Sequence, residues 1–212
     1  MKAVIFDLDG TLLDVREGFY WQFKELTKVF DGAPVSEGDI AAVAHGTTEQ
    51  IVRRLVRNSD VPFDNILEHH KRLRLQAYDR YLKLYDGVDE LLPILRTMGI
   101  KIAALTSGNQ LELDCLARTG IRDNFDLVVT AEHVTNHKPH PEGVLLIMEK
   151  LGVHADEVII VGDTVADILA GKNAGLHKTI GVTHGFGASE ALQAAGADHI
   201  VPNIPSVLDV LE

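Results

Sequence analysis

The stretch AVIFDLDGTLLD, residues 3–14, sets four apolar residues before two aspartates that are two positions apart. A continuous apolar run of this length predicts a strand buried on both faces, as in a parallel sheet. Residues i and i+2 of a strand point to the same side, so Asp7 and Asp9 should project together unless the chain turns between them. Two carboxylates that close repel each other unless a cation lies between them or one of them holds a proton. Folding alone gives no reason for this pair, which therefore indicates a function.

Beyond about residue 84, short β-branched runs alternate with stretches of helical spacing. The strand candidates are IKIAALT (100–106), DLVVT (126–130), EVIIVGD (157–163), KTIGVT (178–183) and HIVP (199–202), and a last helix is expected over IPSVLDVLE (204–212). Several of the intervening helical stretches end at a glycine, which suits a helix C-terminus. The alternation predicts βαβ units, and hence an α/β fold with a Rossmann-like parallel sheet covered by helices on both faces.

Residues 15–83 have a different pattern, with four stretches of helical spacing and no convincing strand. Ser36 and Asp39 match a capping box, and Asp64 is expected to cap the long last helix of this region. The predicted organisation is therefore a core of residues 1–14 and 84–212, interrupted by an α-helical cap domain of residues 15–83.

Composition limits the class of protein and its partners. The 212 residues are 46% hydrophobic and carry a formal net charge of −11. Such an acidic chain is a poor partner for nucleic acid or an anionic membrane surface, and no apolar run approaches the roughly 18 residues that span a bilayer. The single cysteine leaves no internal disulfide and fits a reducing compartment. We expect a cytoplasmic protein, either a monomer or a homodimer.

Chemically active residue types gather at the predicted strand ends, where parallel α/β sheets bind their ligands. They are Asp7 and Asp9 after the first strand, Thr106, Ser107, Gly108 and Asn109 after the second, Lys138 in the loop after the third, and Asp163 and Asp167 after the fourth. Each of these residues alone is common in turns and caps. Together they predict one crevice, because clustered acids without partners are costly. A calcium-binding loop starting at Asp7 is excluded, since its glycine and bidentate-acid positions hold Leu12 and Gly18.

This set of groups suits phosphoryl transfer through a covalent aspartyl-phosphate. A carboxylate nucleophile divides one difficult displacement into two easier ones. Positive charge around the phosphoryl oxygens supplies most of the acceleration, and Mg²⁺ on hard oxygen ligands together with Lys138 would provide it. Thr106 and nearby backbone amides would donate hydrogen bonds to the remaining oxygens. A second carboxyl group beside the nucleophile can protonate the leaving oxygen and then activate water.

The segments FDLDGTLLD, LTSGN, HKPHPE and VGDTVAD, in this order, resemble the four motifs of the haloacid dehalogenase superfamily. The resemblance covers the whole chain and includes a helical cap inserted after the first motif. DGVDELLPIL and GVTHGFGASEALQAAGADHIV resemble the phosphoglycolate phosphatase-like members in particular. The resemblance implies a phosphatase that acts on small phosphorylated metabolites, such as phosphoglycolate or sugar phosphates.

Roles for individual residues follow from the same resemblance. It implies that Asp7 is the nucleophile, that Asp9 is the general acid and base, and that Lys138 joins the phosphoryl group to the nucleophile. Thr106 would bind the phosphoryl group, while either Ser107 or Asn109 could make the next contact beside Gly108. The implied metal site consists of Asp7, Asp163 and the backbone carbonyl of Asp9, with Asp167 completing or supporting it. Candidates for substrate specificity are Thr47 and Thr48 in the cap and His184 in the loop after the fifth strand.

Several alternatives stay open at this stage. The presence of Asp9 disfavours a dehalogenase, because dehalogenases usually lack this second aspartate. A sugar-phosphate mutase or other phosphotransferase is disfavoured by the sequence REGFYWQF (16–23), which lacks the histidine that mutases carry there. Inorganic pyrophosphate is a further candidate substrate. A non-catalytic phospho-acceptor resembling receiver domains would be about half as long and lack the cap. His137 and His140 flank Lys138, and their roles are not assigned.

Overall fold

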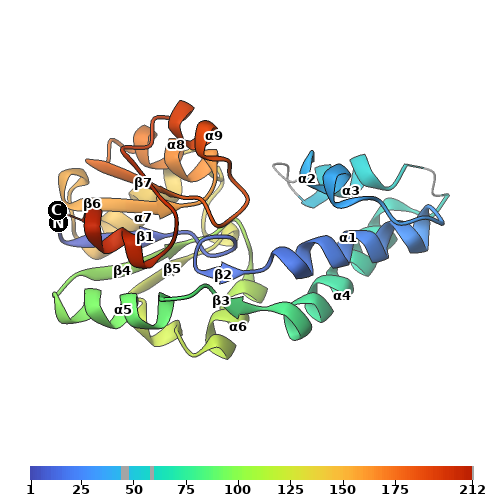
Figure 1. Ribbon diagram of the computed structural model, residues 1–212, viewed down its shortest axis with the longest axis horizontal. Helices are drawn as coiled ribbons and strands as arrows, with labels where there is room; N and C mark the ends of the chain where they lie inside the picture. The colour runs from blue at the N-terminus through green and yellow to red at the C-terminus, as the bar shows by residue number, and fades with distance from the viewer. Residues whose placement is uncertain (44–47, 58–59, 212) are drawn as a thin grey trace. The chain divides into compact units, whose positions relative to one another are not determined.

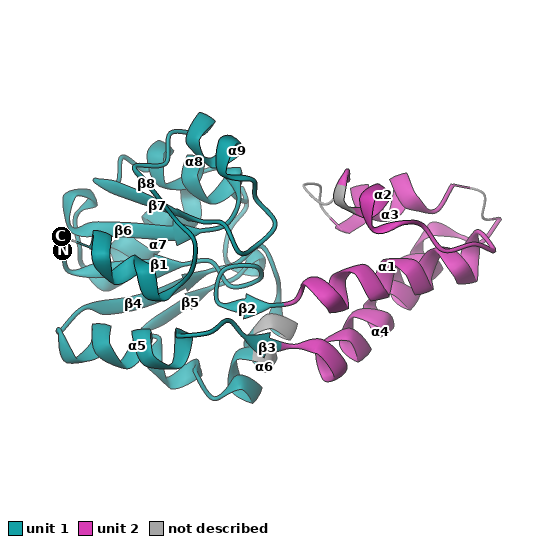
Figure 2. Cartoon of the chain, viewed as in Figure 1, with its two compact units in different colours: residues 1–14, 83–212 teal, residues 15–82 magenta. Residues whose placement is uncertain are grey.

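The computed structural model describes residues 1–43, 48–57 and 60–211, which form two compact units (Figure 2). Unit 1 comprises Met1–Asp14 and Lys83–Glu212, and unit 2 comprises Val15–Leu82. Lys83, which the sequence analysis placed in the helical insert, belongs to unit 1 because it pairs with Asp14 in a short ribbon.

The sheet of unit 1 has six parallel strands in the order β5-β4-β1-β6-β7-β8 (Figure 1). Their bounds are β1 (Ala3–Phe6), β4 (Lys101–Leu105), β5 (Leu127–Val129), β6 (Val158–Gly162), β7 (Lys178–Val182) and β8 (His199–Val201). All six coincide with predicted strands, and the α/β class with a Rossmann-like sheet is confirmed. The chain builds the sheet outward from β1 first through β4 and β5, then on the other side through β6, β7 and β8. The carboxyl end of β1 therefore lies at a topological switch point of the sheet.

Alternation along the strands explains how the sheet buries both faces. Ile5, Leu105 and Ile160 point to the same face, where they pack in one apolar cluster with Val144 and Ile147. The latter two lie on α7 (Glu142–Leu151), and α8 (Val165–Asn173) packs against β6 and β7 beside it. Helix α5 (Val88–Thr97) packs on β4, and its buried leucines lie outside that cluster. Burial of each such side chain contributes about 1.5–3 kcal/mol relative to exposure.

Unit 1 has two further α-helices and four 3₁₀ segments among its described residues. They are α6 (Gln110–Thr119), α9 (Ser189–Ala194) and the 3₁₀ segments η1 (Arg122–Asn124), η2 (Ala131–His133), η3 (Ala155–Glu157) and η4 (Pro205–Val210). The segment η4 lies within residues 204–212, where a last helix was expected, and it is a 3₁₀ helix. Its hydrogen bonds from Val207 to Ile204 and from Leu211 to Leu208 span three residues, which defines a 3₁₀ helix.

A two-stranded antiparallel ribbon was not expected from the sequence. It consists of β2 (Leu13–Asp14) and β3 (Lys83–Leu84), and the amide of Tyr85 extends it with a 3.0 Å hydrogen bond to the carbonyl of Leu12. Strands of two residues are too short to show a period in the sequence. Both passages of the chain into and out of unit 2 run directly from this ribbon.

Unit 2 is helical in its described residues. Its helices are α1 (Arg16–Phe30), α2 (Glu37–Ala41), α3 (Thr48–Leu55) and α4 (Phe63–Tyr81). The long helices α1 and α4 pack against each other, with Gly18 close to Ala77. Phe23 and Ile66 belong to the shared apolar core.

The two predicted helix caps of unit 2 have different outcomes. The capping box is confirmed, since the Ser36 hydroxyl accepts from the Asp39 amide at 3.2 Å and the Asp39 carboxylate accepts from the Ser36 amide at 3.1 Å. The cap at Asp64 is wrong. Helix α4 already begins at Phe63 with Pro62 in the capping position, and Asp64 lies in the first turn, where a carboxylate favours the helix dipole.

His70 of α4 gives unit 2 a pH-dependent stability. Its side chain stacks on Phe23 with ring centroids 4.9 Å apart and is 4% exposed. Burial, with a further contribution from Arg74, lowers the pKa of His70 from 6.5 to about 4. The unfolded chain therefore binds a proton more readily than the folded one, so stability is fully present above about pH 6.5 and is lost as the pH falls towards 4.

Protonation of His70 should lower the free energy of unfolding of the wild type by about 3 kcal/mol between pH 7 and pH 4. We expect this decrease to be absent in His70→Leu. Urea unfolding at several pH values, followed by circular dichroism, measures this difference. His69→Leu is the matched control, because the adjacent ring is only partly buried. An unchanged pH dependence in His70→Leu would contradict the assignment.

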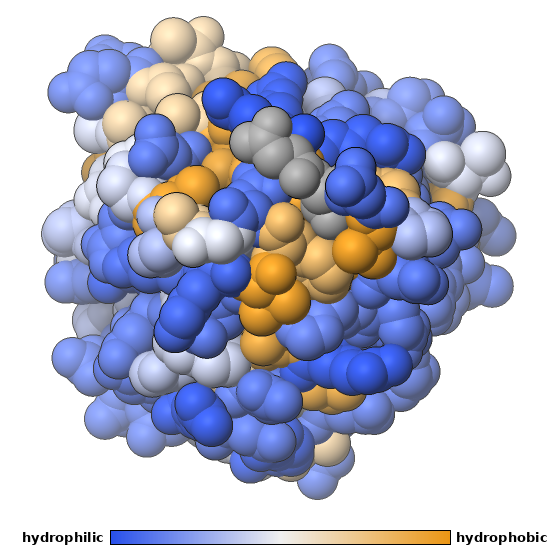
Figure 3. All heavy atoms as spheres, turned by 90° about the vertical axis from the view of Figure 1, so that its right-hand side faces the viewer, coloured by the Kyte–Doolittle hydropathy of each residue, from blue (hydrophilic) through white to orange (hydrophobic). Residues whose placement is uncertain are grey.

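The molecular surface is mainly polar on the face drawn in Figure 3, where a group of apolar side chains lies near the middle. The predominance of hydrophilic residues agrees with the net charge of −11. Among the described residues, none of the helices has the length and hydropathy needed to cross a bilayer.

Candidate active site

The turn after β1 places Asp7 at the switch point and reverses the chain within a few residues. The amides of Thr11, Leu12 and Leu13 all donate to the carbonyl of Leu8, at 3.1, 2.9 and 2.8 Å. Gly10 has φ +93°, a conformation that favours glycine, and a Cβ there would lie 2.5 Å from Asp163 Oδ2. The sequence Asp-Gly-Thr thus allows this turn to pack directly against a second acid.

Asp163 follows β6 and is completely buried. Its Oδ1 accepts a hydrogen bond from the Thr11 hydroxyl at 2.9 Å, and its Oδ2 accepts from the backbone amide of Phe186 at 2.8 Å. The first donor belongs to the turn after β1, and the second belongs to the loop after β7. Both carboxylate oxygens are therefore fixed by neighbouring loops at the same edge of the sheet.

Lys138 connects the acids of the site. Its Nζ lies 2.5 Å from Asp7 Oδ1 and 2.6 Å from Asp167 Oδ1, and it also donates to the carbonyl of Leu105 at 3.0 Å. Asp167 in turn accepts from the amide and the hydroxyl of Thr164 at 3.0 and 2.6 Å, as a cap of α8. The lysine is thus held by side chains from two strand ends.

Burial and mutual repulsion control the ionisation of these groups. Burial raises the pKa of Asp7 well above its usual value despite the opposing effect of Lys138. Burial and the charge of Asp167 raise the pKa of Asp163 to about 7. Burial disfavours the charged form of Lys138, but Asp167 and Asp7 outweigh it and raise the pKa of the amine. Three buried carboxyl groups therefore share one ammonium group, and a further cation would favour the ionised forms of Asp7 and Asp163.

The residues present fit a divalent metal ion. Asp7, Asp163 and Asp167 each offer a carboxylate oxygen, and these oxygens lie within 4.8 Å of one another. Carboxylate oxygens are hard ligands, and a divalent cation would favour their ionised forms. Asp9, whose backbone carbonyl was predicted as a further metal ligand, lies half-buried in the turn, and its carboxylate is not part of this group of three.

The predicted phosphate-binding run lies at the neighbouring strand end. Thr106 directly follows β4, is buried, and its amide donates to the carbonyl of Val129 at 3.0 Å. Its hydroxyl accepts a hydrogen bond from the amide of Gly108 at 2.9 Å, which closes a tight turn. Ser107 and Asn109 are exposed on this turn.

The loop that carries Lys138 is held by two residues that the sequence analysis missed. The carboxylate of Glu142 accepts from the amides of Thr135 and Asn136 at 2.8 and 2.9 Å. The side chain of Asn173, on α8, donates to the carbonyl of Pro139 at 3.0 Å. An acid in the first turn after Pro141 was a usable signal for Glu142, whereas nothing in the sequence links residue 173 to this loop. His137 and His140 lie exposed on the loop.

The residues predicted to determine substrate specificity do not lie together in one described unit. Thr47 lies outside the described residues, and Thr48 is exposed at the start of α3 in unit 2. The ring of His184 stacks on Tyr85, with centroids 3.8 Å apart, and its Nε2 lies 2.9 Å from the carbonyl oxygen of Thr11. These contacts tie His184 to the turn after β1.

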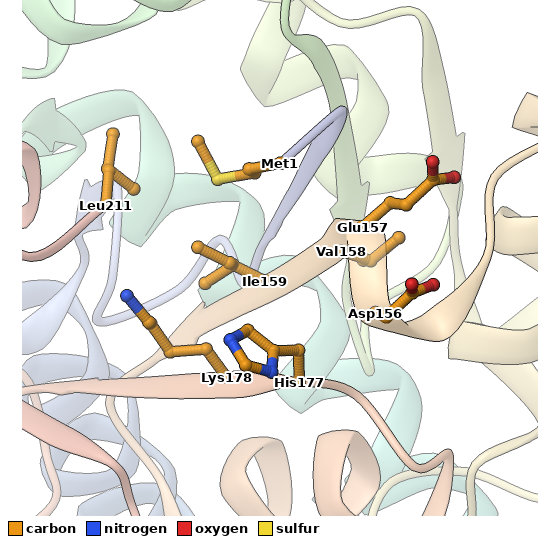
Figure 4. A pocket seen from close by; sticks show the side chains of 8 residues that line it. All are labelled: Met1, Asp156, Glu157, Val158, Ile159, His177, Lys178 and Leu211. Carbon is orange, nitrogen blue, oxygen red and sulfur yellow. The ribbon is translucent and has the colours of Figure 1, made fainter.

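A hollow of about 180 Å³ lies at the opposite end of the strands and is not the candidate site (Figure 4). Its lining residues are Met1, Asp156, Glu157, Val158, Ile159, His177, Lys178 and Leu211. They cluster where β6 and β7 begin, whereas Asp7 and Asp163 follow strand ends. In Figure 4 the carboxylates of Asp156 and Glu157 lie away from the amine of Lys178. This amine donates to the carbonyl of Val210 at 2.8 Å.

Comparison with families of known proteins gives one match that covers most of the chain. Residues 4–182 match the family model described as haloacid dehalogenase-like hydrolase. This range contains all the residues of the candidate site in unit 1 apart from the loop after β7.

Individual relatives match along their whole length. A phosphorylated carbohydrates phosphatase of Thermotoga maritima is 31% identical, over 100% of this chain and 99% of the relative. Pyrophosphatase PpaX of Halalkalibacterium halodurans is 27% identical, over 100% and 97%. The crystal structure of a predicted phosphoglycolate phosphatase from Haemophilus somnus superposes with a TM-score of 0.88, at 22% identity and over 100% and 98% of the two chains.

Proposed function

The chain belongs to the haloacid dehalogenase-like hydrolase family and is a phosphatase of phosphorylated substrates, and from this premise we propose a Mg²⁺-dependent hydrolase of small phosphate monoesters. The observation that carries the proposal is the position of Lys138. Its ammonium group contacts both Asp7 and Asp167 at the edge of the sheet where Asp163 also lies. A buried carboxylate held beside a fixed positive charge is suited to attack a phosphoryl group whose own oxygens are negative.

In the first step, a carboxylate oxygen of Asp7 forms a bond to phosphorus while the bond from phosphorus to the leaving oxygen breaks. The carboxyl group of Asp9 donates its proton to that oxygen, so the alcohol departs neutral. The product is an aspartyl-phosphate on Asp7. Because the leaving group departs as an alcohol, no alkoxide has to form. General acid catalysis of this kind accelerates a reaction by about 10²–10⁴-fold.

In the second step, the Asp9 carboxylate takes a proton from water as the water oxygen attacks phosphorus. The bond between phosphorus and Asp7 breaks, which releases inorganic phosphate and restores both carboxyl groups to their starting states. Lys138 keeps Asp7 oriented in both steps. Thr106, Ser107, Gly108 and Asn109, at the end of β4, are proposed to bind the phosphoryl oxygens.

Mg²⁺ held by Asp7, Asp163 and Asp167, when bound, would supply positive charge to the phosphoryl oxygens and reduce their repulsion of the nucleophile. The fit rests on the oxygen-only donor set and on the three carboxyl groups that share one ammonium group. The backbone carbonyl of Asp9 is proposed as a further ligand.

The proposed substrates are small phosphorylated metabolites, such as phosphoglycolate and sugar phosphates. The relative named as a phosphorylated carbohydrates phosphatase supports this class. Inorganic pyrophosphate is the second candidate, because relatives at similar identity carry the name pyrophosphatase. Unit 1 would be the catalytic core and unit 2 the cap that selects the substrate, through residues such as Thr48. We place this metabolic role in the cytoplasm.

Phosphate release with Mg²⁺, across a panel of sugar phosphates, phosphoglycolate and pyrophosphate, tests this proposal. One ester should be hydrolysed well above the others, and EDTA should lower its rate by at least about 100-fold, with full recovery when Mg²⁺ is added back. Preference for pyrophosphate would select the second candidate. Transfer of the phosphoryl group to another sugar hydroxyl, or release unaffected by EDTA, would contradict the proposal.

A further inference from the structure

The segment His184–Gly187, in the loop after β7, packs closely against Asp163. The Phe186 amide donates to Asp163 Oδ2, as described above. A Cβ added at Gly185 would lie 2.2 Å from the same oxygen and 2.4 Å from the carbonyl oxygen of Gly10. A Cβ at Gly187 would lie 1.9 Å from the backbone oxygen of Asp163. The two glycines thus permit a backbone approach that no other residue would allow.

The ring of His184 connects this segment to the other side of Asp163. Its Nε2 lies 2.9 Å from the Thr11 carbonyl oxygen, which can only accept, so Nε2 carries the hydrogen and donates it. The hydroxyl of the same Thr11 donates to Asp163 Oδ1. His184 is therefore linked to both hydrogen bonds that hold Asp163. It contacts Thr11, whose hydroxyl donates to Oδ1, and it lies two residues before Phe186, whose amide donates to Oδ2.

Tyr85 fixes the orientation of the His184 ring. The two rings stack at 3.8 Å with an interplanar angle of 24°, and the Tyr85 hydroxyl donates to the His184 carbonyl at 3.2 Å. The amide of Tyr85 is bound to Leu12 in the turn after β1. His184 is thus held at the face of its ring, at Nε2 and at its backbone carbonyl, and each contact leads back to the same turn.

We propose that His184 is a positioning residue for the metal site, which keeps both oxygens of Asp163 and the turn of residues 8–13 in the arrangement that binds Mg²⁺. This assignment replaces a substrate contact for His184. It rests on the proposed function only in requiring that Asp7, Asp163 and Asp167 bind Mg²⁺. Its effect is exerted on metal affinity, so it can be measured without any substrate.

Isothermal titration of Mg²⁺ into metal-free protein tests the assignment. His184→Phe preserves an aromatic ring against Tyr85 but removes the hydrogen bond to Thr11, and we expect the Kd for Mg²⁺ to rise about fivefold or more. His184→Gln places an amide donor near the position of Nε2, and we expect a Kd within about twofold of the wild type. Rescue by glutamine separates positioning through the hydrogen bond from a general loss of packing.

A second measurement distinguishes positioning from substrate contact. At saturating Mg²⁺, the KM of His184→Phe for p-nitrophenyl phosphate should stay within about twofold of the wild-type value. His69→Phe, the same exchange in unit 2, is the control and should alter neither constant. Tyr85→Leu, which removes the stacking partner, should raise the Kd for Mg²⁺ in the same direction and serves if His184→Phe does not fold.

An unchanged Kd for Mg²⁺ in folded His184→Phe or Tyr85→Leu would overturn the assignment, and a raised KM in that case would return His184 to substrate contact. Absence of Mg²⁺ binding by the wild type would refute the metal of the proposed function, and the assignment with it. The two failures are distinct, because only the first is observed against a wild type that binds the metal.

Discussion

Replacement of Asp7 by asparagine is expected to lower kcat for phosphate release by at least about 10⁴-fold, which corresponds to about 5.5 kcal/mol of transition-state stabilisation. The amide has nearly the shape of the carboxylate but is a poor nucleophile, so the aspartyl-phosphate cannot form. Asp7→Asn also removes one negative charge from a site where three carboxyl groups share Lys138. The variant should therefore fold and be no less stable than the wild type.

Steady-state kinetics on the best substrate of the panel measures this loss. Asp123→Asn is the matched control, since Asp123 is exposed on η1 in the same unit. It should leave kcat within about twofold of the wild-type value, as surface exchanges usually do. Substantial turnover by Asp7→Asn would show that the nucleophile is another group.

Replacement of Lys138 by methionine is expected to impair both activity and folding. Its side chain is 6% exposed and lies against Asp7 and Asp167, so removal of the amine leaves buried acids without their cation. Loss of one partner of a buried ion pair costs about 3–5 kcal/mol. For a chain of 212 residues this corresponds to a Tm lower by about 10 °C. The rate should fall by at least about 100-fold, because a charge close to the phosphoryl oxygens is lost.

Thermal unfolding with and without Mg²⁺ separates the causes of this effect. Added Mg²⁺ should raise the Tm of Lys138→Met by more than that of the wild type, because the ion replaces part of the missing positive charge. Lys150→Met, at an exposed position near the end of α7, should alter the Tm by no more than about 2 °C. A Tm for Lys138→Met equal to that of the wild type would contradict a structural role for the ion pairs.

The six strands of the parallel sheet were predictable because burial on both faces places an apolar run in most of them. Ile5 and Ile160, for example, lie in such runs and pack in one cluster. Helix starts were less predictable. Asp64 is a strong capping residue by type, yet the capping position of α4 is Pro62, two residues earlier. The ribbon of β2 and β3 joins residues about 70 positions apart through two pairs, which leaves no local signal.

Part of the candidate site also followed from the sequence. The strand ends bring Asp7, Lys138, Asp163 and Asp167 together, because parallel strands share one carboxyl edge. Their roles in catalysis remain predictions that the variants above test.

Apart from Glu142, the supporting contacts of the site could not be foreseen. Phe186 holds Asp163 through its backbone amide, so its residue type carries no signal. Asn173 reaches the Lys138 loop from a helix 34 positions away in sequence. His184 has a side chain suited to substrate contact, and only the three-dimensional packing reveals Tyr85 and Thr11 as its neighbours. Backbone donors and long-range contacts of this kind depend on tertiary structure alone.

Direct detection of the phosphoryl group on Asp7 is the measurement that tests the account most directly. Asp9→Asn is to be mixed with p-nitrophenyl phosphate and Mg²⁺, quenched in acid, digested and analysed by mass spectrometry. The nitrophenolate leaves without a proton, so the first step proceeds, whereas the second step lacks its base and the intermediate accumulates. We predict one phosphoryl group per chain on the peptide that contains Asp7. A release of nitrophenol with no phosphoryl group on Asp7, or with the group on another residue, would contradict the account.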